Sequence, residues 1–288
     1  MVMRMHGNVD SARGLVPTGH LCWAFSSRSE FRSRVVEYLR DGLAHGQWIE
    51  YVGSGSSAGL RAELAEADGL GPALEAGTIA VTPVEDFYVL QSENAAVDPS
   101  AAVKARIAAT EQALAAGYSG FRAVVDATAM VATAEQRAAF VQFEHLIDRI
   151  MNAMPVTALC GYSLTELGST AVAELACLHP LTNLDVPFQL HAQPDGSLAL
   201  SGSVDRHSAD LFTHALSHAA ELAPDEALVL DGQHLTGIEP AGLRELDELA
   251  RQHDRHVVFR SAPADTARLI QQLQPSHVRI EMSVPESQ

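Results

Sequence analysis

Lysine is nearly absent from this chain of 288 residues, because Lys104 is the only one. Lysine and arginine together number 19 against 36 aspartates and glutamates, which gives a formal net charge of −17 at pH 7. A field of this sign repels a phosphate backbone, so we expect no nucleic acid among the partners. The acidity favours a basic protein partner, or it serves only to keep the chain in solution.

Long apolar runs are also missing, since no stretch reaches the ~18–20 residues that a membrane-spanning helix needs. Residues 1–19 lack the apolar core of a signal peptide, and we expect them to form a flexible tail. The three cysteines, Cys22, Cys160 and Cys177, are an odd number in a chain without an export signal, so disulfides are not expected. These absences predict a cytoplasmic protein without a membrane partner.

The residues that are present predict two α/β domains. The chain is 47% hydrophobic and is long enough for both. Short apolar runs alternate with helical patterns, which indicates a mainly parallel sheet between layers of helices. The first domain is placed at residues 20–180, a linker at 181–187 and the second domain at 188–288. The predicted strands of the first domain are 20–25, 48–53, 78–84, 121–128 and 156–163.

The second domain is predicted to open with a hairpin, because FQLHAQ and SLALSG flank the turn sequence PDG. Helices and strands then alternate, with a strand at 227–231 and a helix from Pro240 onward. Pro240 suits the first turn of a helix, and Leu243, Leu246 and Leu249 recur at helical spacing. We expect a loop between this strand and this helix.

The segments LALSGSVD (198–205) and ALVLDGQHLTGIEPAGLRELDELAR (227–251) resemble the STAS family of anti-sigma-factor antagonists. The resemblance implies a STAS-like α/β fold that docks a protein partner at the start of a helix. It also implies a switch of partner binding, because a hydroxyl at this position is phosphorylated in the family. The phosphate adds negative charge beside the partner. Pro240 and Ala241 stand at the two hydroxyl positions of the family motif, so the switch is missing here.

Docking itself needs the shape of the segment and not the hydroxyl, so the resemblance still implies a partner. The expected partner is an anti-sigma factor or a related ATPase of the histidine-kinase type. Thr236 is a hydroxyl upstream of the motif, either a substitute modification site or a group that bonds to local backbone. The candidate partner-binding residues are Asp231, Thr236, Gly237, Glu239, Pro240, Ala241 and Gly242.

The first domain resembles the MEDS family of sensory domains. The residues that carry the resemblance are HLCWAFSSRSEF (20–31), YLRDGLAHGQWIEYV (38–52), GYSGFRAVVDATAM (117–130), the helix around Phe143-Glu144, VTALCGYS (156–163) and CLHP (177–180). The resemblance implies a RecA/KaiC-like sheet covered by helices, and a small organic ligand. An ATPase of that lineage would carry Gly-Lys-Ser/Thr after the first strand, where this chain has FSSRSEF. We therefore expect no enzyme activity and no cofactor, and keep a degenerate nucleotide-binding ATPase relative as an alternative.

Histidine and cysteine side chains cluster in the strands that the resemblance places side by side. His20 and Cys22 face one side of their strand, Cys160 lies in the fifth strand, and His179 follows Cys177. Thiolate and imidazole together can hold zinc, although the Cys-x-x-Cys spacing that makes such a prediction strong is absent. Buried cysteine otherwise packs as a small hydrophobe.

Three interpretations of these residues therefore stay open: packing, a ligand pocket, and a metal or redox sensor built on His20, Cys22 and Cys160. Arg122 and Tyr162 are further pocket candidates, and Arg122 serves equally well in a salt bridge to a helix acid. The candidate ligand-binding residues are His20, Cys22, Arg122, Cys160, Tyr162 and His179, with no metal assigned. The sequence thus predicts a non-enzymatic cytoplasmic regulator that couples ligand sensing, or a homodimer surface, to partner docking.

Overall fold

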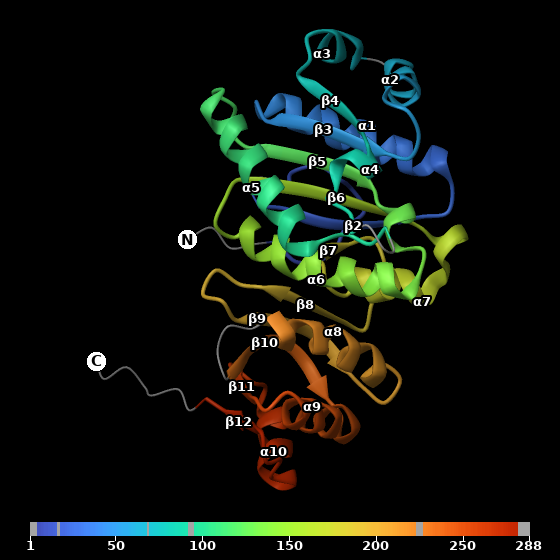
Figure 1. Cartoon of the computed structure of the whole chain (residues 1–288). Coiled ribbons are helices and arrows are strands. Elements are labelled where there is room, and N and C mark those ends of the chain that lie inside the picture. Colours follow the sequence, from blue (N-terminus) through green and yellow to red (C-terminus); the bar gives the residue numbers. More distant parts are fainter. Residues whose placement is uncertain (1–4, 16–17, 68, 92–94, 223–226, 282–288) are drawn as a thin grey trace. The chain divides into compact units, whose positions relative to one another are not determined.

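The computed structural model describes residues 5–15, 18–67, 69–91, 95–222 and 227–281. The chain divides into two compact units, Met1–Asp185 and Val186–Gln288. Each unit carries its own sheet and its own helices (Figure 1). The α/β class expected from the sequence is confirmed for both.

The first unit is built on a seven-stranded sheet of described residues in the order β1-β7-β2-β6-β5-β3-β4, and every neighbouring pair in it is parallel. Its strands are β1 (Gly7–Asn8), β2 (His20–Phe25), β3 (Trp48–Gly53), β4 (Ile79–Pro83), β5 (Phe121–Asp126), β6 (Val156–Ser163) and β7 (Leu181–Thr182). Its helices are α1 (Arg28–Ala44), α2 (Ser57–Ala65), α3 (Gly71–Glu75), α4 (Val84–Phe87), α5 (Pro99–Ala115), α6 (Ala134–Met151) and α7 (Leu164–Ala176), with a 3-10 turn η1 at Thr128–Val131.

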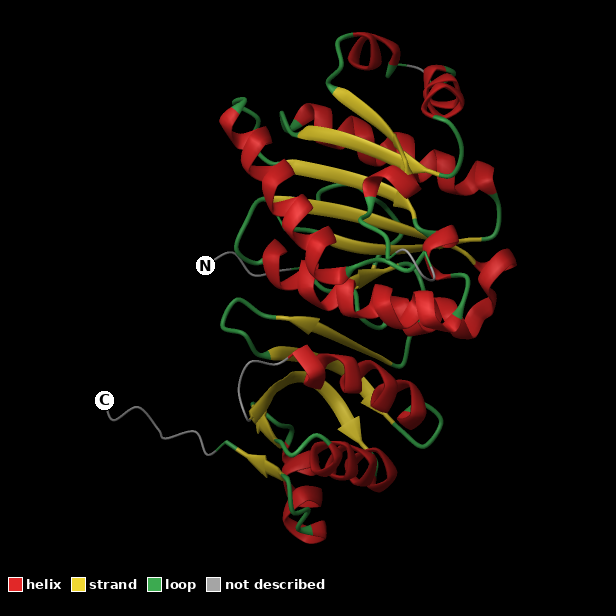
Figure 2. Ribbon diagram, in the orientation of Figure 1, coloured by secondary structure: helices red, strands yellow, loops and turns green. Residues whose placement is uncertain are grey.

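Helices cover both faces of this sheet (Figure 2), and the three central strands β2, β6 and β5 are buried along their whole length. Burial on both sides explains why these strands are continuous apolar runs and not alternating patterns. The helices begin at polar caps: Ser27 accepts from the amide of Glu30 at the start of α1, and Thr133 forms a capping box with Gln136 at the start of α6.

The first and fifth predicted strands are neighbours, as the resemblance implied. Strand β2 pairs with β6 in a register that sets His20 opposite Ala158 and Cys22 opposite Cys160. In parallel strands, residues opposite each other point to the same side of the sheet. The register therefore places His20, Cys22 and Cys160 on one face, under helix α6.

Parts of the expected flexible tail (1–19) and of the expected linker (181–187) are ordered elements of the first unit. Residues 1–4 and 16–17 of the tail lie outside the described residues. Strand β1 pairs with β7, so Gly7 lies opposite Leu181. Ala12 and Leu15 are buried in the core of the first unit, because they are apolar. The beginning of the predicted linker, 181–182, is strand β7 for the same reason: Leu181 and Thr182 are both buried.

The second unit holds a five-stranded mixed sheet of described residues in the order β12-β11-β10-β9-β8. The predicted hairpin is present, because β8 and β9 pair antiparallel around the PDG turn. The strands are β8 (Phe188–Ala192), β9 (Leu198–Val204), β10 (Ala227–Ile238), β11 (His256–Arg260) and β12 (Val278–Ile280), and the helices are α8 (Ala209–Leu222), α9 (Pro240–Gln252) and α10 (Ala264–Leu273).

One expectation for this unit is wrong: the strand predicted to stop at Asp231 continues to Ile238. It follows β9 past two irregularities, one between Asp231 and His234 and one between Leu235 and Gly237. Bulges of this kind let a strand keep its partner although its side-chain alternation is interrupted. The broken alternation is what made the segment resemble a loop in the sequence.

Helices of the described residues are all too short or too polar to cross a lipid bilayer.

Candidate functional site

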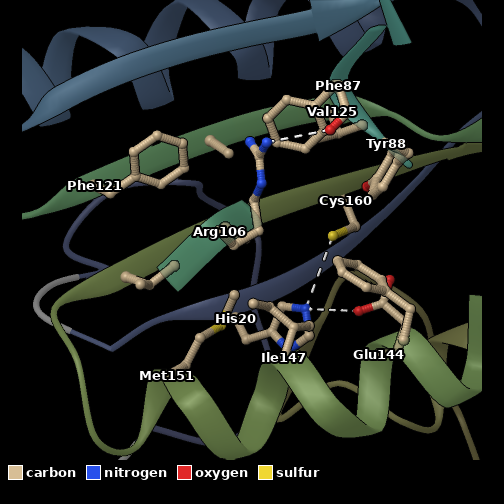
Figure 3. A pocket seen from close by; sticks show the side chains of 14 residues that line it. His20, Phe87, Tyr88, Arg106, Phe121, Val125, Glu144, Ile147, Met151 and Cys160 are labelled. Atoms are coloured by element: carbon tan, nitrogen blue, oxygen red, sulfur yellow. Dashed lines mark hydrogen bonds and ion pairs between the residues drawn. The ribbon is translucent and has the colours of Figure 1, made fainter. Parts of the chain in front are cut away.

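A pocket opens between the face of the first sheet that carries His20 and the helices α5 and α6 (Figure 3). The space between its lining atoms is about 350 Å³, counting the part open to solvent. Most of the lining is apolar. The lining residues are His20, Phe87, Tyr88, Arg106, Phe121, Ala123, Val125, Phe143, Glu144, Ile147, Met151, Val156, Ala158 and Cys160.

The sequence places these side chains by strand alternation and helix periodicity. Strand β5 contributes every second residue from Phe121 to Val125, and β6 contributes every second residue from Val156 to Cys160. Helix α6 presents Phe143, Ile147 and Met151 at spacings of four, which is one face of a helix. The small side chains of Ala123 and Ala158 leave the space that larger residues would fill.

Arg106 brings a charged group to this apolar pocket. Its guanidinium lies 3.7 Å from the centre of the Phe87 ring, and Nη2 donates to the Phe87 carbonyl oxygen at 3.2 Å. Nη1 is buried and makes no hydrogen bond within the described part of the chain, although Glu50 Oε2 lies 3.5 Å away. Burial lowers the pKa of Arg106, so the group would gain from an additional acceptor.

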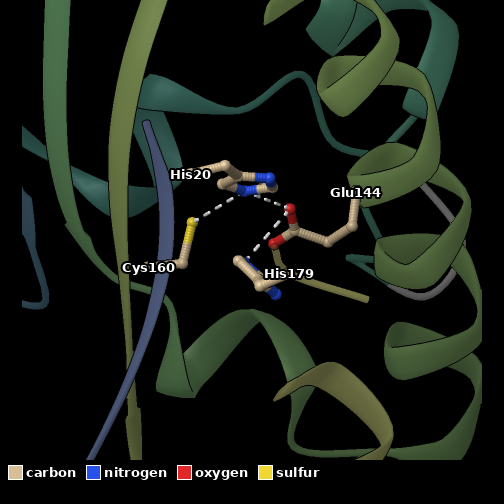
Figure 4. Close-up of side chains that lie close together, drawn as sticks. All are labelled: His20, Glu144, Cys160 and His179. Atoms are coloured by element: carbon tan, nitrogen blue, oxygen red, sulfur yellow. Dashed lines mark hydrogen bonds and ion pairs between the residues drawn. The ribbon is translucent and has the colours of Figure 1, made fainter. Parts of the chain in front are cut away.

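A compact group of four polar side chains borders the pocket: His20, Glu144, Cys160 and His179 (Figure 4). One ligand-type atom from each lies within 4.8 Å of the corresponding atoms of the others. The group draws on β2, α6, β6 and the turn after α7. All four residues are buried, with at most 4% of their surface exposed. We call these four residues the buried cluster.

Short distances join the members of the buried cluster. His20 Nε2 lies 3.1 Å from Glu144 Oε2 and 3.8 Å from Cys160 Sγ. His179 Nε2 lies 3.7 Å from the same oxygen of Glu144. That oxygen makes no well-aligned hydrogen bond with the described residues, although two ring nitrogens approach it.

A second layer of contacts orients the buried cluster. Asp148, one turn after Glu144 on α6, lies with Oδ1 2.9 Å from His20 Nδ1. The carbonyl oxygen of Leu175 lies 2.9 Å from His179 Nδ1, and the Tyr162 hydroxyl donates to Glu144 Oε1 at 2.8 Å. A carbonyl oxygen only accepts, so Nδ1 of His179 carries the hydrogen.

Burial sets the protonation of the cluster. Burial and the neighbouring His20 lower the pKa of His179 to about 4, which keeps this ring neutral near pH 7. Burial alone would lower the pKa of His20, but its hydrogen bonds to Asp148 and Glu144 outweigh that effect and raise it. Burial raises the pKa of the Cys160 thiol well above its ordinary value, so a thiolate there needs a nearby cation.

The structure brings together His20, Cys160, Tyr162 and His179 of the six predicted ligand-binding residues. Cys22 lies beside them on β2 but does not line the pocket. Its side chain hydrogen-bonds to Thr182 and burial raises its pKa.

Arg122 lies elsewhere, on the opposite face of β5 from the pocket, because its neighbours Phe121 and Ala123 are the ones that line it. Its Nη2 donates to Asp41 Oδ2 at 3.0 Å, its Nε donates to Gln47 Oε1 at 2.6 Å, and its guanidinium lies over the Tyr38 ring. The alternative of a salt bridge to a helix acid is therefore what the structure contains, and Arg122 is not a pocket residue.

Glu144, Asp148 and Arg106 were not predicted as site residues. Their signal in the sequence is weak: Glu144 and Asp148 are acids four residues apart, next to the apolar positions Phe143 and Ile147 of α6. An acid beside an apolar stripe is usually the solvated edge of a helix. Here both are buried, with 1% of their surface exposed, which only the tertiary contacts reveal.

The predicted docking segment of the second unit is the end of β10 and the start of α9. Thr236, Glu239 and Pro240 are exposed. The Thr236 hydroxyl donates to the Gly202 carbonyl oxygen at 2.8 Å, so it bonds to the backbone of the neighbouring strand β9 and not to local backbone. Glu239 is the N-cap residue of α9, without a side-chain capping bond to the helix. Its Oε2 instead accepts from the amide of Arg206 at 3.2 Å.

The remaining residues of this segment are partly or fully covered. Asp231 lies inside β10 and accepts from Gln193 Nε2 at 3.2 Å, Gly237 and Ala241 are half-buried, and Gly242 is buried. A Cβ atom at Gly242 would lie 2.7 Å from Val204 Cγ1, so glycine is required for α9 to approach β9. The exposed surface of the segment is therefore narrower than the sequence predicted.

A phosphate-binding loop of the ATPase lineage would lie in a turn between a strand and a helix, and the turns after β2 and β3 hold helix caps. Ser27 caps α1 and Ser56 caps α2 by accepting from the amide of Gly59. Lys104, the only lysine of the chain, lies within α5. A lysine at the phosphates, which the phosphate-binding loop requires, therefore follows neither turn.

Comparison with known families matches residues 19–180 to MEDS, described as the MEthanogen/methylotroph, DcmR Sensory domain. No curated protein matches the chain. Among solved structures, the anti-sigma factor antagonist SpoIIAA in its unphosphorylated form is 11% identical at a TM-score of 0.27, over 33% of this chain and 89% of that one. The helicase MrfA bound to DNA and AMPPNP is 10% identical at a TM-score of 0.32, over 93% of this chain and 46% of the helicase. Neither structural likeness is strong enough to carry an argument.

Proposed function

This chain belongs to the MEDS family of sensory domains over residues 19–180, and from that premise we propose that it is a non-enzymatic cytoplasmic regulator. Its first unit binds a small organic molecule in the pocket between the sheet and α6. Its second unit is a STAS-like module that docks a protein partner of the anti-sigma-factor or histidine-kinase-like class. The observation that carries the proposal is the apolar pocket that lies inside the region shared with a sensory family.

The pocket has the composition expected of a small-molecule site, with many apolar walls and few polar groups. Aromatic rings from Phe87, Tyr88, Phe121 and Phe143 line it, and such rings supply large contact areas to an apolar ligand. The polar groups of the lining belong to Arg106, to Tyr88 through its hydroxyl, and to the three members of the buried cluster that line the pocket. A ligand bound here would be oriented by these few groups and held by burial of its apolar surface.

Arg106 favours a ligand with one hydrogen-bond acceptor. Its Nη1 is buried without a hydrogen bond to the described residues, and an ordered acceptor would relieve that cost. We therefore expect the ligand to be small and mainly apolar, with a hydroxyl, carbonyl or carboxylate oxygen that reaches Arg106. This is a statement about chemical class, argued from the lining residues.

For the second unit, the proposal rests on the segment that resembles the STAS motif. The exposed residues Thr236, Glu239 and Pro240 lie close to the start of α9, where a partner could contact them. Ala241 removes the hydroxyl on which the family switch depends, so partner binding would be controlled by the ligand of the first unit and not by phosphorylation at this position.

The ligand half of the proposal is tested by native mass spectrometry of the full chain purified from its own host. A bound small molecule that raises the melting temperature of the apo protein when added back would support it. Arg106→Met should remove that shift, whereas Arg137→Met should keep it, because Arg137 pairs with Glu174 away from the pocket. No co-purifying molecule, or a shift that survives Arg106→Met, would argue against the pocket as the binding site.

The partner half is tested by capture of host proteins on the full chain and on two variants. Glu239→Arg reverses an exposed charge in the docking segment, and Glu248→Arg does the same on the exposed side of α9. We expect the first to lose an anti-sigma factor or kinase-like ATPase and the second to retain it. Equal capture by both variants would exclude this segment as the docking surface.

A further inference from the structure

The buried cluster and the neighbouring Asp148 place two acidic side chains where water cannot solvate them. Glu144 and Asp148 are each 1% exposed and sit one turn apart on α6, and His20 lies between them, 3.1 Å from one and 2.9 Å from the other. Buried carboxylates are costly unless a cation or hydrogen bonds compensate them. One imidazolium can compensate them in part, and a metal ion can do so more fully.

The four side chains of the buried cluster have the composition of a transition-metal site. Two imidazoles, one thiol and one carboxylate are ligands that zinc takes in tetrahedral sites, whereas magnesium and calcium prefer oxygen alone. Zinc binds nitrogen and oxygen at about 2.0–2.2 Å and sulfur at about 2.3 Å, so the ligand atoms of a tetrahedral site stand roughly 3.3–3.7 Å apart.

Three distances in the buried cluster lie within about 0.2 Å of that range. His20 Nε2 and Glu144 Oε2 are 3.1 Å apart, His179 Nε2 and Glu144 Oε2 are 3.7 Å apart, and His20 Nε2 and Cys160 Sγ are 3.8 Å apart. In Figure 4 the side chains point toward one another from separate elements. Small rotations of these side chains would bring four ligand atoms around one ion.

Groups outside the buried cluster orient its ligands as they do in known metal sites. Metal-bound histidines usually donate their second ring N–H to a carboxylate or a backbone carbonyl. Asp148 occupies that position for His20 and Leu175 occupies it for His179, so both rings turn Nε2 inward. The Tyr162 hydroxyl holds the other oxygen of Glu144, which leaves Oε2 facing the two imidazoles.

We propose that His20, Glu144, Cys160 and His179 bind one divalent transition-metal ion, with zinc as the expected occupant. Binding replaces protons by the ion: the Cys160 thiol loses its hydrogen, and His20 loses any hydrogen on Nε2. The two positive charges of the ion then face one thiolate and one carboxylate, while both imidazoles are neutral ligands.

This metal site deepens the proposed function, because three of its four residues line the pocket assigned to the ligand. A molecule in the pocket would lie next to the ion, so the molecule and the ion could each change the binding affinity of the other. The two ideas are nevertheless separable. Metal content is measured without any ligand, so a chain that holds metal and answers to no small molecule would retain the site and lose the sensing role.

The experiment is elemental analysis of the full chain, as purified and after dialysis against a chelator followed by zinc or cobalt. We expect about one equivalent of zinc per chain. We expect cobalt to give the visible absorption of a tetrahedral site, with a thiolate-to-cobalt band in the near ultraviolet. Cys160→Ser should lose that band, whereas Cys22→Ser should keep it, because Cys22 is equally buried on the neighbouring strand but lies outside the buried cluster.

The affinity of the chain for zinc supplies a second measurement, made on a variant that keeps all four proposed metal ligands. Asp148→Asn should weaken zinc binding about 10- to 100-fold, the usual effect of losing an outer partner of a metal-bound histidine. Circular dichroism of each variant checks that it folds. A folded wild-type chain that takes up neither zinc nor cobalt would overturn the proposal, and so would a cobalt spectrum without a thiolate band or an equal loss of metal in the two cysteine variants.

Discussion

Replacement of Arg122 by methionine is expected to destabilise the first unit strongly without changing the chemistry of its pocket. The buried guanidinium donates to Gln47 Oε1, to the Tyr38 carbonyl oxygen and to Asp41 Oδ2. Methionine keeps much of the side-chain length and none of these donors. The change therefore separates a structural role from the ligand-binding role that the sequence first suggested.

The size of the effect follows from the groups that lose a partner. Gln47 is 3% exposed, so its amide oxygen would be left without its charged donor, at about 1–3 kcal/mol. The Asp41 side chain is 13% exposed, so water compensates it in part. Breaking a buried ion pair from one side costs about 3–5 kcal/mol, and we expect the lower half of that range.

Tryptophan fluorescence during urea unfolding measures this loss in the full chain. The only two tryptophans, Trp23 and Trp48, both belong to the first unit, so the signal is selective for it. A loss of about 3 kcal/mol lowers the urea midpoint by about 1–3 M. Arg28→Met is the control, because Arg28 is 55% exposed in its pair with Glu63 and such pairs contribute at most about 1 kcal/mol. The reasoning is refuted if both variants shift the midpoint equally, or if Arg122→Met abolishes ligand binding in a chain of unchanged stability.

Three further expectations concern the pocket and the second unit. Ala123→Leu should fill the pocket and abolish the ligand-induced shift in melting temperature. The free energy of unfolding without ligand should change by no more than about 1–2 kcal/mol. A retained shift would show that the ligand binds elsewhere. Gly242→Ala should cost about 1–3 kcal/mol in the second unit because its Cβ would meet Val204, and Val204→Ala in the same chain should recover part of it, as followed by circular dichroism. Incubation with a kinase that phosphorylates STAS proteins should leave the wild-type chain unmodified near Ala241 and add one phosphate to Ala241→Ser, as measured by intact mass. Phosphorylation of wild-type Thr236 would contradict the expectation that this segment has lost its switch.

The architecture could be predicted from the sequence because its signals are local. Strands buried on both faces are continuous apolar runs, as in VTALCGYS, and the PDG turn marks the hairpin of the second unit. The continuation of β10 beyond Asp231 could not be predicted, because bulges interrupt the alternation on which a strand assignment depends. The strand at Gly7 and Asn8 could not be predicted either, because two residues show no periodicity. These residues form a strand only because they pair with β7.

The candidate site was predicted in part because half of it lies on strands. His20 and Cys160 follow from alternation and from the adjacency of β2 and β6, which the resemblance implied. Glu144 and Asp148 come from a helix, where an acid next to the apolar stripe could equally face solvent. Arg122 shows the converse case, because a charged residue in a buried strand can serve the pocket or the opposite face, and a shift of one position decides between them.

The pairing of Gly7 and Asn8 with β7 bears on how fragments of this protein should be designed. Strand β7 would otherwise end the sheet with unpaired amide and carbonyl groups, which are available to a second chain. The Gly7 amide donates to the Pro180 carbonyl oxygen at 2.7 Å, and the Val9 amide donates to the Thr182 carbonyl oxygen at 2.9 Å. A fragment cut to the family boundary at residue 19 would expose that edge and the apolar surface beneath Ala12 and Leu15. Self-association of such a fragment would therefore be an artefact of the cut and not a property of the native chain.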